Sequence, residues 1–294
     1  LLTKDARLVA HGHTDAAAHY ASFEPSVQEL FKDIPKDTMN EGDTYIFSDP
    51  YRTGSHVNDV RMIRPIFYKG EIVSFLCTVI HWADMGGPMP GTFNPEATTC
   101  FAEGIRIPPI RLFKNNELDE ELFSMIEINI RGAVERRADM KAQFEAARLI
   151  DRRVVELCEK YGVETLFQAY EEQFNYSERM MLAELKSLPD GEWEFEDFGD
   201  QDVMAEGKPP IRVHCKLTKV GSKLSFDWTD SDPQPKASWG GSRATLIGGN
   251  YLGFMICFPQ LFPLNHGIIR NLEIVSKPGT CVDVVFPAPT TGYC

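Results

Sequence analysis

The chain has 294 residues, of which 43% are hydrophobic, and carries a formal net charge of -13. So acidic a composition argues against nucleic acid as a partner, because nucleic-acid binding needs clustered lysine and arginine. The sequence contains neither a signal-peptide pattern nor an apolar run of about 18 residues, so we expect no membrane association and a cytoplasmic protein. Its cysteines form no C-x-x-C pair and fit reduced core residues.

The first region, residues 1–112, mixes short apolar runs with turns. One helix is predicted over residues 24–32, where apolar residues fall on a single face. Three strands are predicted, over residues 44–47, 63–68 and 71–80. The last two are rich in β-favouring residues and meet at Lys69-Gly70, a plausible tight turn, so they predict a β-hairpin.

The second region, residues 113–190, has the pattern of two long helices. Apolar residues recur at spacings of three or four with charged residues between them, as in an amphipathic helix: Met140, Phe144, Ala147, Ile150, Val154 and Leu157. Gly162 suits the position just past a helix C-terminus, so a second helix is expected from about Val163. We predict that the two helices pack as an antiparallel pair, which is a helical hairpin.

The third region, residues 191–294, returns to strand patterns. Alternation over residues 211–218 and 223–228 predicts a second hairpin, with its loop at residues 219–222. The apolar run over residues 244–258 favours a helix and leaves a buried strand as the alternative. The fold class expected is therefore α+β: a mixed, β-rich metal-site region, a long antiparallel helix pair and a second β-rich region.

Two motifs flank the hairpin of the first region: DPYRTGSHVND at residues 49–59 and HWADMGG at residues 81–87. The first holds His56 and Asp59 at a spacing of three, and the hairpin returns the chain so that His81 arrives nearby. Imidazole and carboxylate together suit Zn, Mn, Fe or Co. Because the group has no thiolate, it favours a site with an open position for water or substrate over a closed structural zinc site.

The same motifs also form turns, in which Asp and His commonly cap the backbone. Either histidine alone would favour capping. Two H-x-x-D patterns on either side of one hairpin favour a metal or catalytic site, so His56, Asp59 and His81 are our candidate ligands.

Three other polar groups have alternative interpretations. Glu103, near Arg106, has two interpretations. It could line a site, as a base or as a group that orients a ligand histidine, or it could be an exposed acid in a loop. A cluster of aspartates lacks the register of an EF-hand and indicates a strand end and turn: Asp227, Asp230 and Asp232. A second potential ligand group has His19 nearby: His11, His13 and Asp15.

Nucleotide-binding and serine-hydrolase motifs are missing from the sequence. It contains neither G-x-x-x-x-G-K-[ST] nor G-x-G-x-x-G, and it lacks the G-x-S-x-G pattern of a nucleophile elbow. Any chemistry with ATP would therefore need another chain.

In combination, these motifs resemble the hydantoinase B (HyuB-type) subunits. That family includes N-methylhydantoinase B, the B-like part of 5-oxoprolinase, and related subunits of acetone and acetophenone carboxylases. The resemblance covers most of the chain and rests on five stretches in this order: GDTYIFSDPYRTGSHVNDV, HWADMGG, FNPEATTCFAEGIRIPP, ERRADMKAQFEAARLIDRRVVELCEKYG and DWTDSDPQ.

The resemblance implies the B-type subunit of a heteromeric, ATP-dependent enzyme. A hydantoinase A-type partner would use ATP to phosphorylate the substrate, and the B-type subunit would act on the activated species at a divalent metal, namely Zn, Mn or Fe. Hydrolysis of a cyclic amide such as a hydantoin, a lactam or oxoproline is the expected reaction. Carboxylation of a ketone, as in the acetone and acetophenone enzymes, is the alternative.

The resemblance also implies roles for individual residues. The family's H-x-x-D and its later histidine match His56, Asp59 and His81, and a fourth carboxylate would precede Leu1, since the chain looks like a piece of a longer polypeptide. The chain departs from the family pattern at Thr53-Gly54-Ser55, Trp82 and Asp230, which affects the expected substrate and not the ligands.

Proton transfer, or support of the ligands, is expected from three carboxylates: Asp84, Asp49 and Glu103. A competing interpretation is a non-catalytic scaffold subunit in which the His and Asp cluster only stabilises the hairpin.

Overall fold

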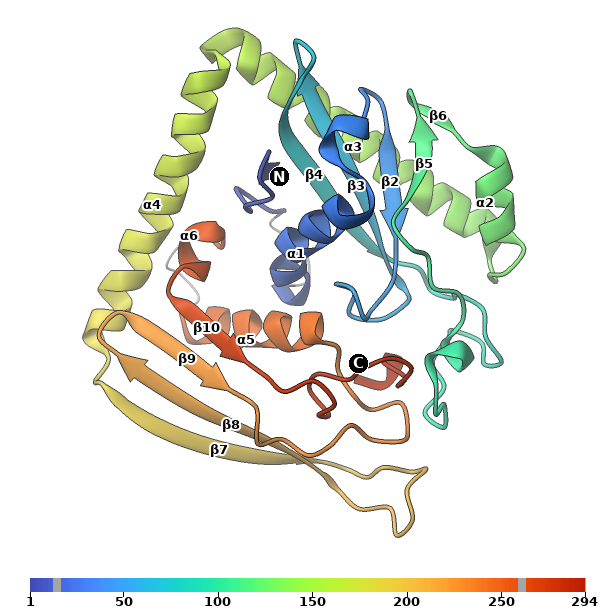
Figure 1. Cartoon of the computed structure of the whole chain (residues 1–294), viewed down its shortest axis with the longest axis vertical. Helices are drawn as coiled ribbons and strands as arrows, with labels where there is room; N and C mark the ends of the chain where they lie inside the picture. Colours follow the sequence, from blue (N-terminus) through green and yellow to red (C-terminus); the bar gives the residue numbers. More distant parts are fainter. Residues whose placement is uncertain (13–16, 259–262, 294) are drawn as a thin grey trace.

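Two β-sheets with helices packed around them make up the computed structural model, which describes residues 1–12, 17–258 and 263–293 (Figure 1). The mixed α+β class is therefore confirmed. No helix in these described ranges is both long and apolar enough to cross a membrane.

The first sheet has six strands in the order β1-β4-β3-β2-β5-β6, and all its neighbours are antiparallel. Its strands are β1 (Leu2–Thr3), β2 (Thr44–Phe47), β3 (Asp59–Tyr68), β4 (Glu71–His81), β5 (Ile110–Lys114) and β6 (Glu117–Leu118). The predicted hairpin is confirmed as β3 and β4. Its turn residues Lys69 and Gly70 have φ values of 53° and 83°, the positive values that tight hairpin turns need. Because β3 begins at Asp59 and not at Ile63, Asp59 lies within the hairpin.

Helices cover both faces of this sheet. On one face lies α1 (Ala17–Asp33), which begins earlier than the predicted residue 24 and accommodates Pro25. Its Val27 and Leu30 share a core cluster with Phe75 of β4. On the other face lie α2 (Glu120–Glu127) and α3 (Ala133–Tyr161). The strand residues facing α1 and those facing α3 alternate along the sequence, as the pleat requires.

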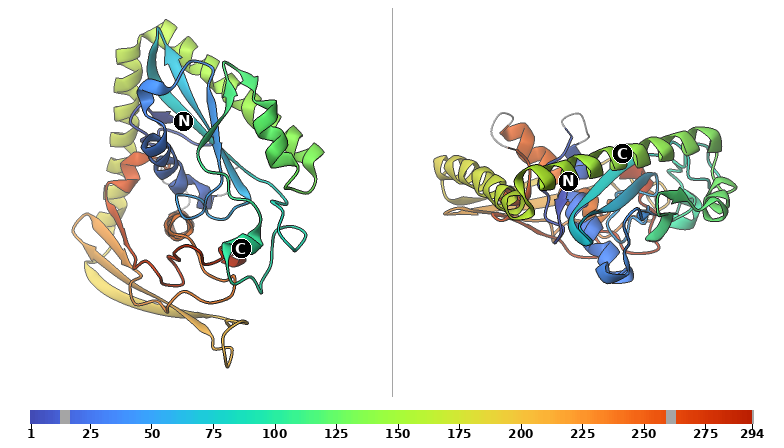
Figure 2. Two further views of the ribbon diagram at one scale, coloured as in Figure 1. Left: turned by 45° about the vertical axis from the view of Figure 1, so that its right-hand side comes forward. Right: turned by 90° about the horizontal axis from the view of Figure 1, so that it is seen from above.

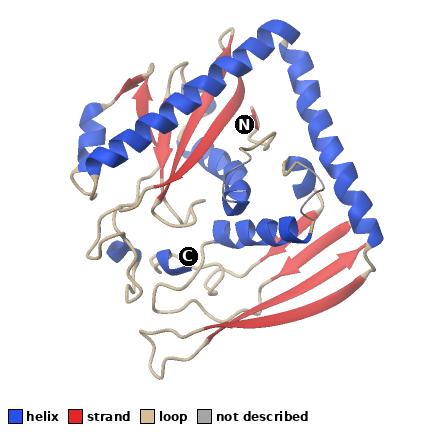
Figure 3. Cartoon of the chain, turned by 180° about the vertical axis from the view of Figure 1, so that it is seen from behind, coloured by secondary structure: helices blue, strands red, loops and turns tan. Residues whose placement is uncertain are grey.

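The two long helices are present, but the predicted antiparallel packing is wrong. From Gly162, α3 and α4 (Val163–Ser187) diverge like two sides of a triangle (Figures 1 and 3). Near the corner both helices contribute to one core cluster, but farther from it they pack on different elements: Phe144 of α3 stacks on Phe113 of β5, whereas Met181 of α4 joins the core cluster of α1. A connection of one residue can turn a corner, but it cannot lay two helices side by side.

The second sheet has the order β10-β9-β8-β7, in which only the pair β10 and β9 is parallel. It contains β7 (Gly191–Gly199), β8 (Ile211–Val220), β9 (Lys223–Asp227) and β10 (Leu272–Val275), with α5 (Arg243–Cys257) and α6 (His266–Ile269) nearby. Strands β8 and β9 confirm the second predicted hairpin, and α5 confirms the predicted helix. Strand β7 was not predicted. Three short 3-10 helices complete the described elements: η1 (Lys36–Thr38), η2 (Cys100–Glu103) and η3 (Thr291–Tyr293).

One core cluster draws on all three predicted regions. Tyr45 of β2, Met181 of α4 and Leu224 of β9 belong to it together. The left-hand view in Figure 2 shows the second sheet at the opposite end of the molecule from the tip of the first hairpin. The division at residues 112 and 190 stays a prediction.

Candidate metal centre

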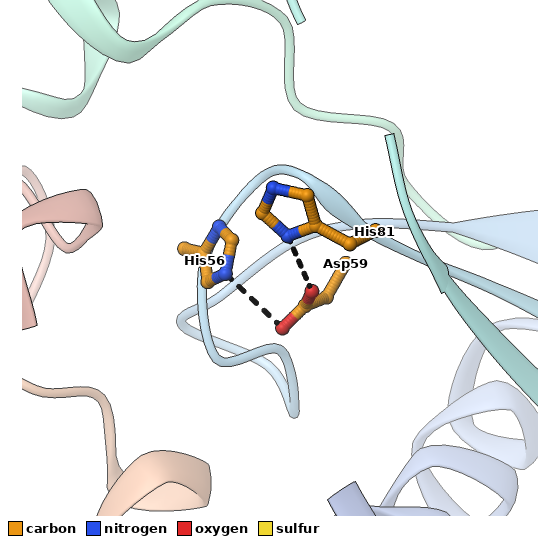
Figure 4. A group of neighbouring side chains, drawn as sticks. All are labelled: His56, Asp59 and His81. Atoms are coloured by element: carbon orange, nitrogen blue, oxygen red, sulfur yellow. Dashed lines mark hydrogen bonds and ion pairs between the residues drawn. The ribbon is translucent and has the colours of Figure 1, made fainter. Parts of the chain in front are cut away.

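The open end of the β3-β4 hairpin brings the three predicted ligands together. Strand register pairs Asp59 with His81, and His56 lies three residues upstream in the loop that enters β3. His81 Nδ1 lies 3.2 Å from Asp59 Oδ1, and His56 Nε2 lies 3.4 Å from Asp59 Oδ2 (Figure 4). One donor atom from each residue lies within 4.8 Å of the other two.

Short-range hydrogen bonds set the orientation of His56. Its Nδ1 lies 3.2 Å from Asn58 Oδ1, and Asn58 in turn donates from Nδ2 to the Trp82 carbonyl at 2.8 Å. A hydrogen bond from Nδ1 to the Asn58 oxygen keeps the proton of the neutral ring on Nδ1. The lone pair is then on Nε2, which faces Asp59. Gly54 permits the tight loop before His56, because a Cβ there would meet the Asp49 carbonyl oxygen at 2.9 Å.

The local electrostatics put both buried groups in the protonation state of ligands. Burial lowers the pKa of His56. The nearby Asp59 acts to raise this pKa and His81 acts to lower it, and the effect of burial is the largest. Burial alone would raise the pKa of Asp59, but the hydrogen bond from His81 and the nearby His56 and His19 imidazoles outweigh it and hold that pKa well below its usual range. At neutral pH the site therefore presents a neutral imidazole and a carboxylate, as metal binding requires.

This donor set fits a divalent first-row metal. It offers two imidazole nitrogens and one carboxylate, the ligand types that such ions take, and the donor atoms lie within 4.8 Å of one another. Asp59 is only 1% exposed, while the His81 side chain is 55% exposed. The group therefore has a buried side that can hold an ion and a side open to solvent.

The three predicted proton-transfer carboxylates form hydrogen bonds with residues outside the three-residue donor group. Asp49 accepts from the Tyr51 amide at 3.0 Å and ion-pairs with Arg106. Glu103 is fully buried and bonded to the segment that contains Thr290. None of the hydrogen bonds resolved in the described residues joins Asp49, Asp84 or Glu103 to His56, Asp59 or His81, so their catalytic roles stay predictions.

The remaining polar groups are placed as follows. Asp227 ends β9, and Asp230 pairs with Arg212, which agrees with a strand end and turn. His11 stacks on Tyr20 with ring centroids 3.7 Å apart. His13 and Asp15 lie outside the described residues.

Sequence reasoning did not assign His19, although its side chain approaches the site. His19 Nδ1 lies 3.8 Å from Asp59 Oδ2. The two residues are 40 positions apart in the sequence. No motif spacing joins them, and only the packing of α1 over the sheet brings them together.

Asp84 is expected to stabilise the loop after β4. It accepts from the Gly86 amide at 2.8 Å and the Gly91 amide at 2.7 Å, and both its oxygens lie 3.1 Å from Arg131 Nη1. An Asp84→Asn variant turns an amide NH₂ toward these donors, so we expect the free energy of unfolding at pH 7 to fall by about 1–3 kcal/mol. Urea unfolding measures this loss, with Asp37→Asn on the surface as control.

The pH dependence of that loss has a definite sign. Burial opposes ionisation of Asp84, but the Gly91 and Gly86 amides and Arg131 outweigh it, so its pKa lies below 3.8. The contribution of Asp84 is therefore present above the unfolded pKa and disappears as the pH falls through the folded pKa. The difference between wild type and Asp84→Asn should narrow below about pH 4. A difference that grows on acidification would contradict this account.

Comparison with known proteins gives a family for this arrangement. The family model described as Hydantoinase B/oxoprolinase matches residues 1–294. A Pseudomonas sp. (strain NS671) protein, assigned by name as the B-type subunit of a D-/L-hydantoinase, is 33% identical over 276 residues, which is 90% of this chain and 46% of that relative.

Solved structures share the fold. The ATP-dependent caprolactamase from Pseudomonas jessenii superposes with a TM-score of 0.87 at 27% identity, covering 99% of this chain and 51% of that one. A nucleotide-free acetone carboxylase structure gives a TM-score of 0.89 at 17% identity over 100% of this chain and 40% of the other, which is a likeness of fold alone. The chain spans about half the length of the hydantoinase and caprolactamase relatives. With the family model matching from end to end, the chain belongs to the hydantoinase B/oxoprolinase family.

Proposed function

We propose that this chain is the metal-binding part of a B-type subunit in an ATP-dependent enzyme that hydrolyses a cyclic amide. The observation that carries the proposal is the convergence of His56, Asp59 and His81 at the open end of one hairpin. The cyclic amide is favoured by the names of two relatives, a hydantoinase subunit at 33% identity and a caprolactamase at 27% identity.

Each residue of the site has a distinct proposed part. Neutral His56 and ionised Asp59 would hold a divalent Zn, Mn or Fe ion from the buried side, and His81 would hold it at the solvent side. When bound, the ion supplies Lewis-acid polarisation of a substrate oxygen. Asn58 keeps the lone pair of His56 aimed at the site through its contact with Nδ1.

ATP would act outside this chain. The sequence has no phosphate-binding motif, so we assign nucleotide binding to a hydantoinase A-type partner subunit. That partner would phosphorylate the substrate, and this subunit would receive the activated species. We expect the complex to be cytoplasmic.

Ketone carboxylation is the alternative reaction. It is the weaker candidate, because the acetone carboxylase structure is similar only at the level of fold. The other alternative, a scaffold subunit, would use the cluster only to stabilise the hairpin. A scaffold that still assembles would keep its activity after His81→Ala.

The test uses the whole protein co-purified with its partner subunit. A panel of hydantoin, caprolactam, 5-oxoproline, acetone and acetophenone is incubated with ATP, with and without bicarbonate, and ADP and products are measured. Ring opening of a cyclic amide without bicarbonate would support the proposal. Turnover of ketones alone, and only with bicarbonate, would replace it with the carboxylase.

A further inference from the structure

We propose that His19, in the first turn of α1, is a positioning residue of this metal centre that holds the carboxylate of Asp59 from the helix side. The inference rests on the proposed metal site. It adds to that site a fourth residue, contributed by a different element of the fold.

The Asp59 carboxylate is surrounded by imidazoles from different elements. His81 Nδ1 lies 3.2 Å from Asp59 Oδ1. The other oxygen, Oδ2, lies 3.4 Å from His56 Nε2 and 3.8 Å from His19 Nδ1. The Ser55 hydroxyl also donates to Oδ2. The His19 side chain is only 18% exposed. Three imidazoles therefore enclose Asp59, two from the hairpin and its entry loop and one from α1.

Hydrogen bonds fix α1 to the strand that carries Asp59. The fully buried Arg61 donates from Nη1 to the Asp59 carbonyl at 3.0 Å and from Nη2 to Ser22 Oγ at 3.0 Å. Ser22 Oγ in turn donates to the His19 carbonyl at 2.7 Å. A chain of hydrogen bonds thus links the backbone of His19 to the backbone of Asp59.

A second link lies one turn further along α1. Ser26 Oγ donates to Thr53 Oγ1 at 3.2 Å, in the loop that leads to His56. The helix is therefore held to both segments that supply buried ligands. Such supporting contacts are what metal sites use to orient their ligands.

The His19 imidazole is placed to support a ligand and not to bind the ion itself. His56, Asp59 and His81 form the donor group, whereas His19 lies outside that group and its Nδ1 faces Asp59 Oδ2. When one carboxylate oxygen serves an ion, the other usually accepts a hydrogen bond from a neighbouring group. At 3.8 Å the His19 contact is longer than a hydrogen bond, and a movement of about 1 Å would bring Nδ1 into donating range. This geometry favours positioning over direct ligation.

The test compares His19→Ala and His19→Asn with wild type in the whole protein with its partner. An Asn amide can donate from nearly the place of Nδ1 but is a poor ligand for Zn²⁺ or Mn²⁺. Dissociation constants for both ions, the Co²⁺ absorption spectrum and thermal unfolding are measured. His214→Ala, which alters an imidazole on the second sheet beside Glu194, is the matched control.

We expect His19→Ala to weaken metal binding by about 10–100-fold, as is typical when a partner of a ligand is lost. His19→Asn should keep most of the affinity and the wild-type Co²⁺ spectrum, and His214→Ala should leave both unchanged. Wild-type affinity in His19→Ala would overturn the inference and leave the proposed function standing. An equal loss in both His19 variants would also overturn it, because the imidazole itself would then bind the ion. If wild type binds no metal, the proposed function fails as well.

Discussion

Replacing His56 and His81 together with alanine is expected to abolish metal binding and to lower turnover by at least about 10³-fold, since a metal Lewis acid contributes several kcal/mol and each 1.4 kcal/mol is about tenfold. The variant leaves Asp59 as the only member of the three-residue donor group. One carboxylate offers too few bonds to retain a divalent ion. Elemental analysis of the whole protein purified with its partner, followed by kcat under saturating ATP, measures both effects.

Exposure allows the effect on chemistry to be separated from an effect on folding. The His81 side chain is 55% exposed, so His81→Ala should leave the protein folded and lower the free energy of unfolding by about 1–3 kcal/mol, the loss of one hydrogen bond to the buried Asp59 carboxylate. His56 is buried, so its single variant should cost more stability. A folded His81→Ala protein with little metal and little turnover would support the site. Wild-type metal content in the double variant, or no metal in wild type, would leave the capping or scaffold interpretation.

The sequence predicted the candidate ligands because the contacts that assemble them are local. His56 and His81 are 25 positions apart, and one hairpin with a tight turn brings them together. Runs of β-favouring residues joined at Lys69-Gly70 predict such a hairpin, and its strand register then places Asp59 opposite His81. The helix α5 and the hairpin of β8 and β9 were predictable for the same reason, since each depends on residues adjacent in the sequence.

Contacts between distant segments were beyond the reach of these patterns. Amphipathic spacing identified α3 and α4, but it says which face is buried and not what buries it, so the corner at Gly162 was not predicted. Strand β7 was not predicted, although Glu192, Glu194 and Glu196 alternate with its aromatic residues in the period-two pattern that is typical of a strand, and most of the strand is exposed. The approach of His19 to Asp59 likewise depends on how α1 packs on the first sheet.

Glu103 shows the same limit, because its partners lie far along the chain. Its carboxylate accepts hydrogen bonds from Ser238 Oγ at 2.8 Å, from the Thr290 amide at 2.8 and 2.9 Å, and from the Thr291 amide at 2.7 Å. The hydroxyls of both threonines also donate to it. A residue predicted as a base or as an exposed loop acid is therefore the buried acceptor that ties η2 to the segment at residues 290–291.

Glu103→Ala is accordingly expected to lower the free energy of unfolding by about 3–5 kcal/mol, because it leaves several buried donors without an acceptor. Glu103→Gln keeps one carbonyl oxygen for the Thr291 amide and should lose less. Urea unfolding of the whole protein measures both variants, with the exposed Glu96→Ala as control.

Metal content and turnover of the same variants distinguish this structural role from proton transfer. With a structural role, Glu103→Gln should bind metal normally, and its turnover should follow the fraction of folded protein. A Glu103→Gln protein of wild-type stability and metal content whose turnover falls by about 10²-fold or more would instead mark a general acid or base. That result would restore the catalytic role predicted for Glu103, and it would require this buried carboxylate to exchange a proton with substrate despite its hydrogen bonds to Ser238, Thr290 and Thr291.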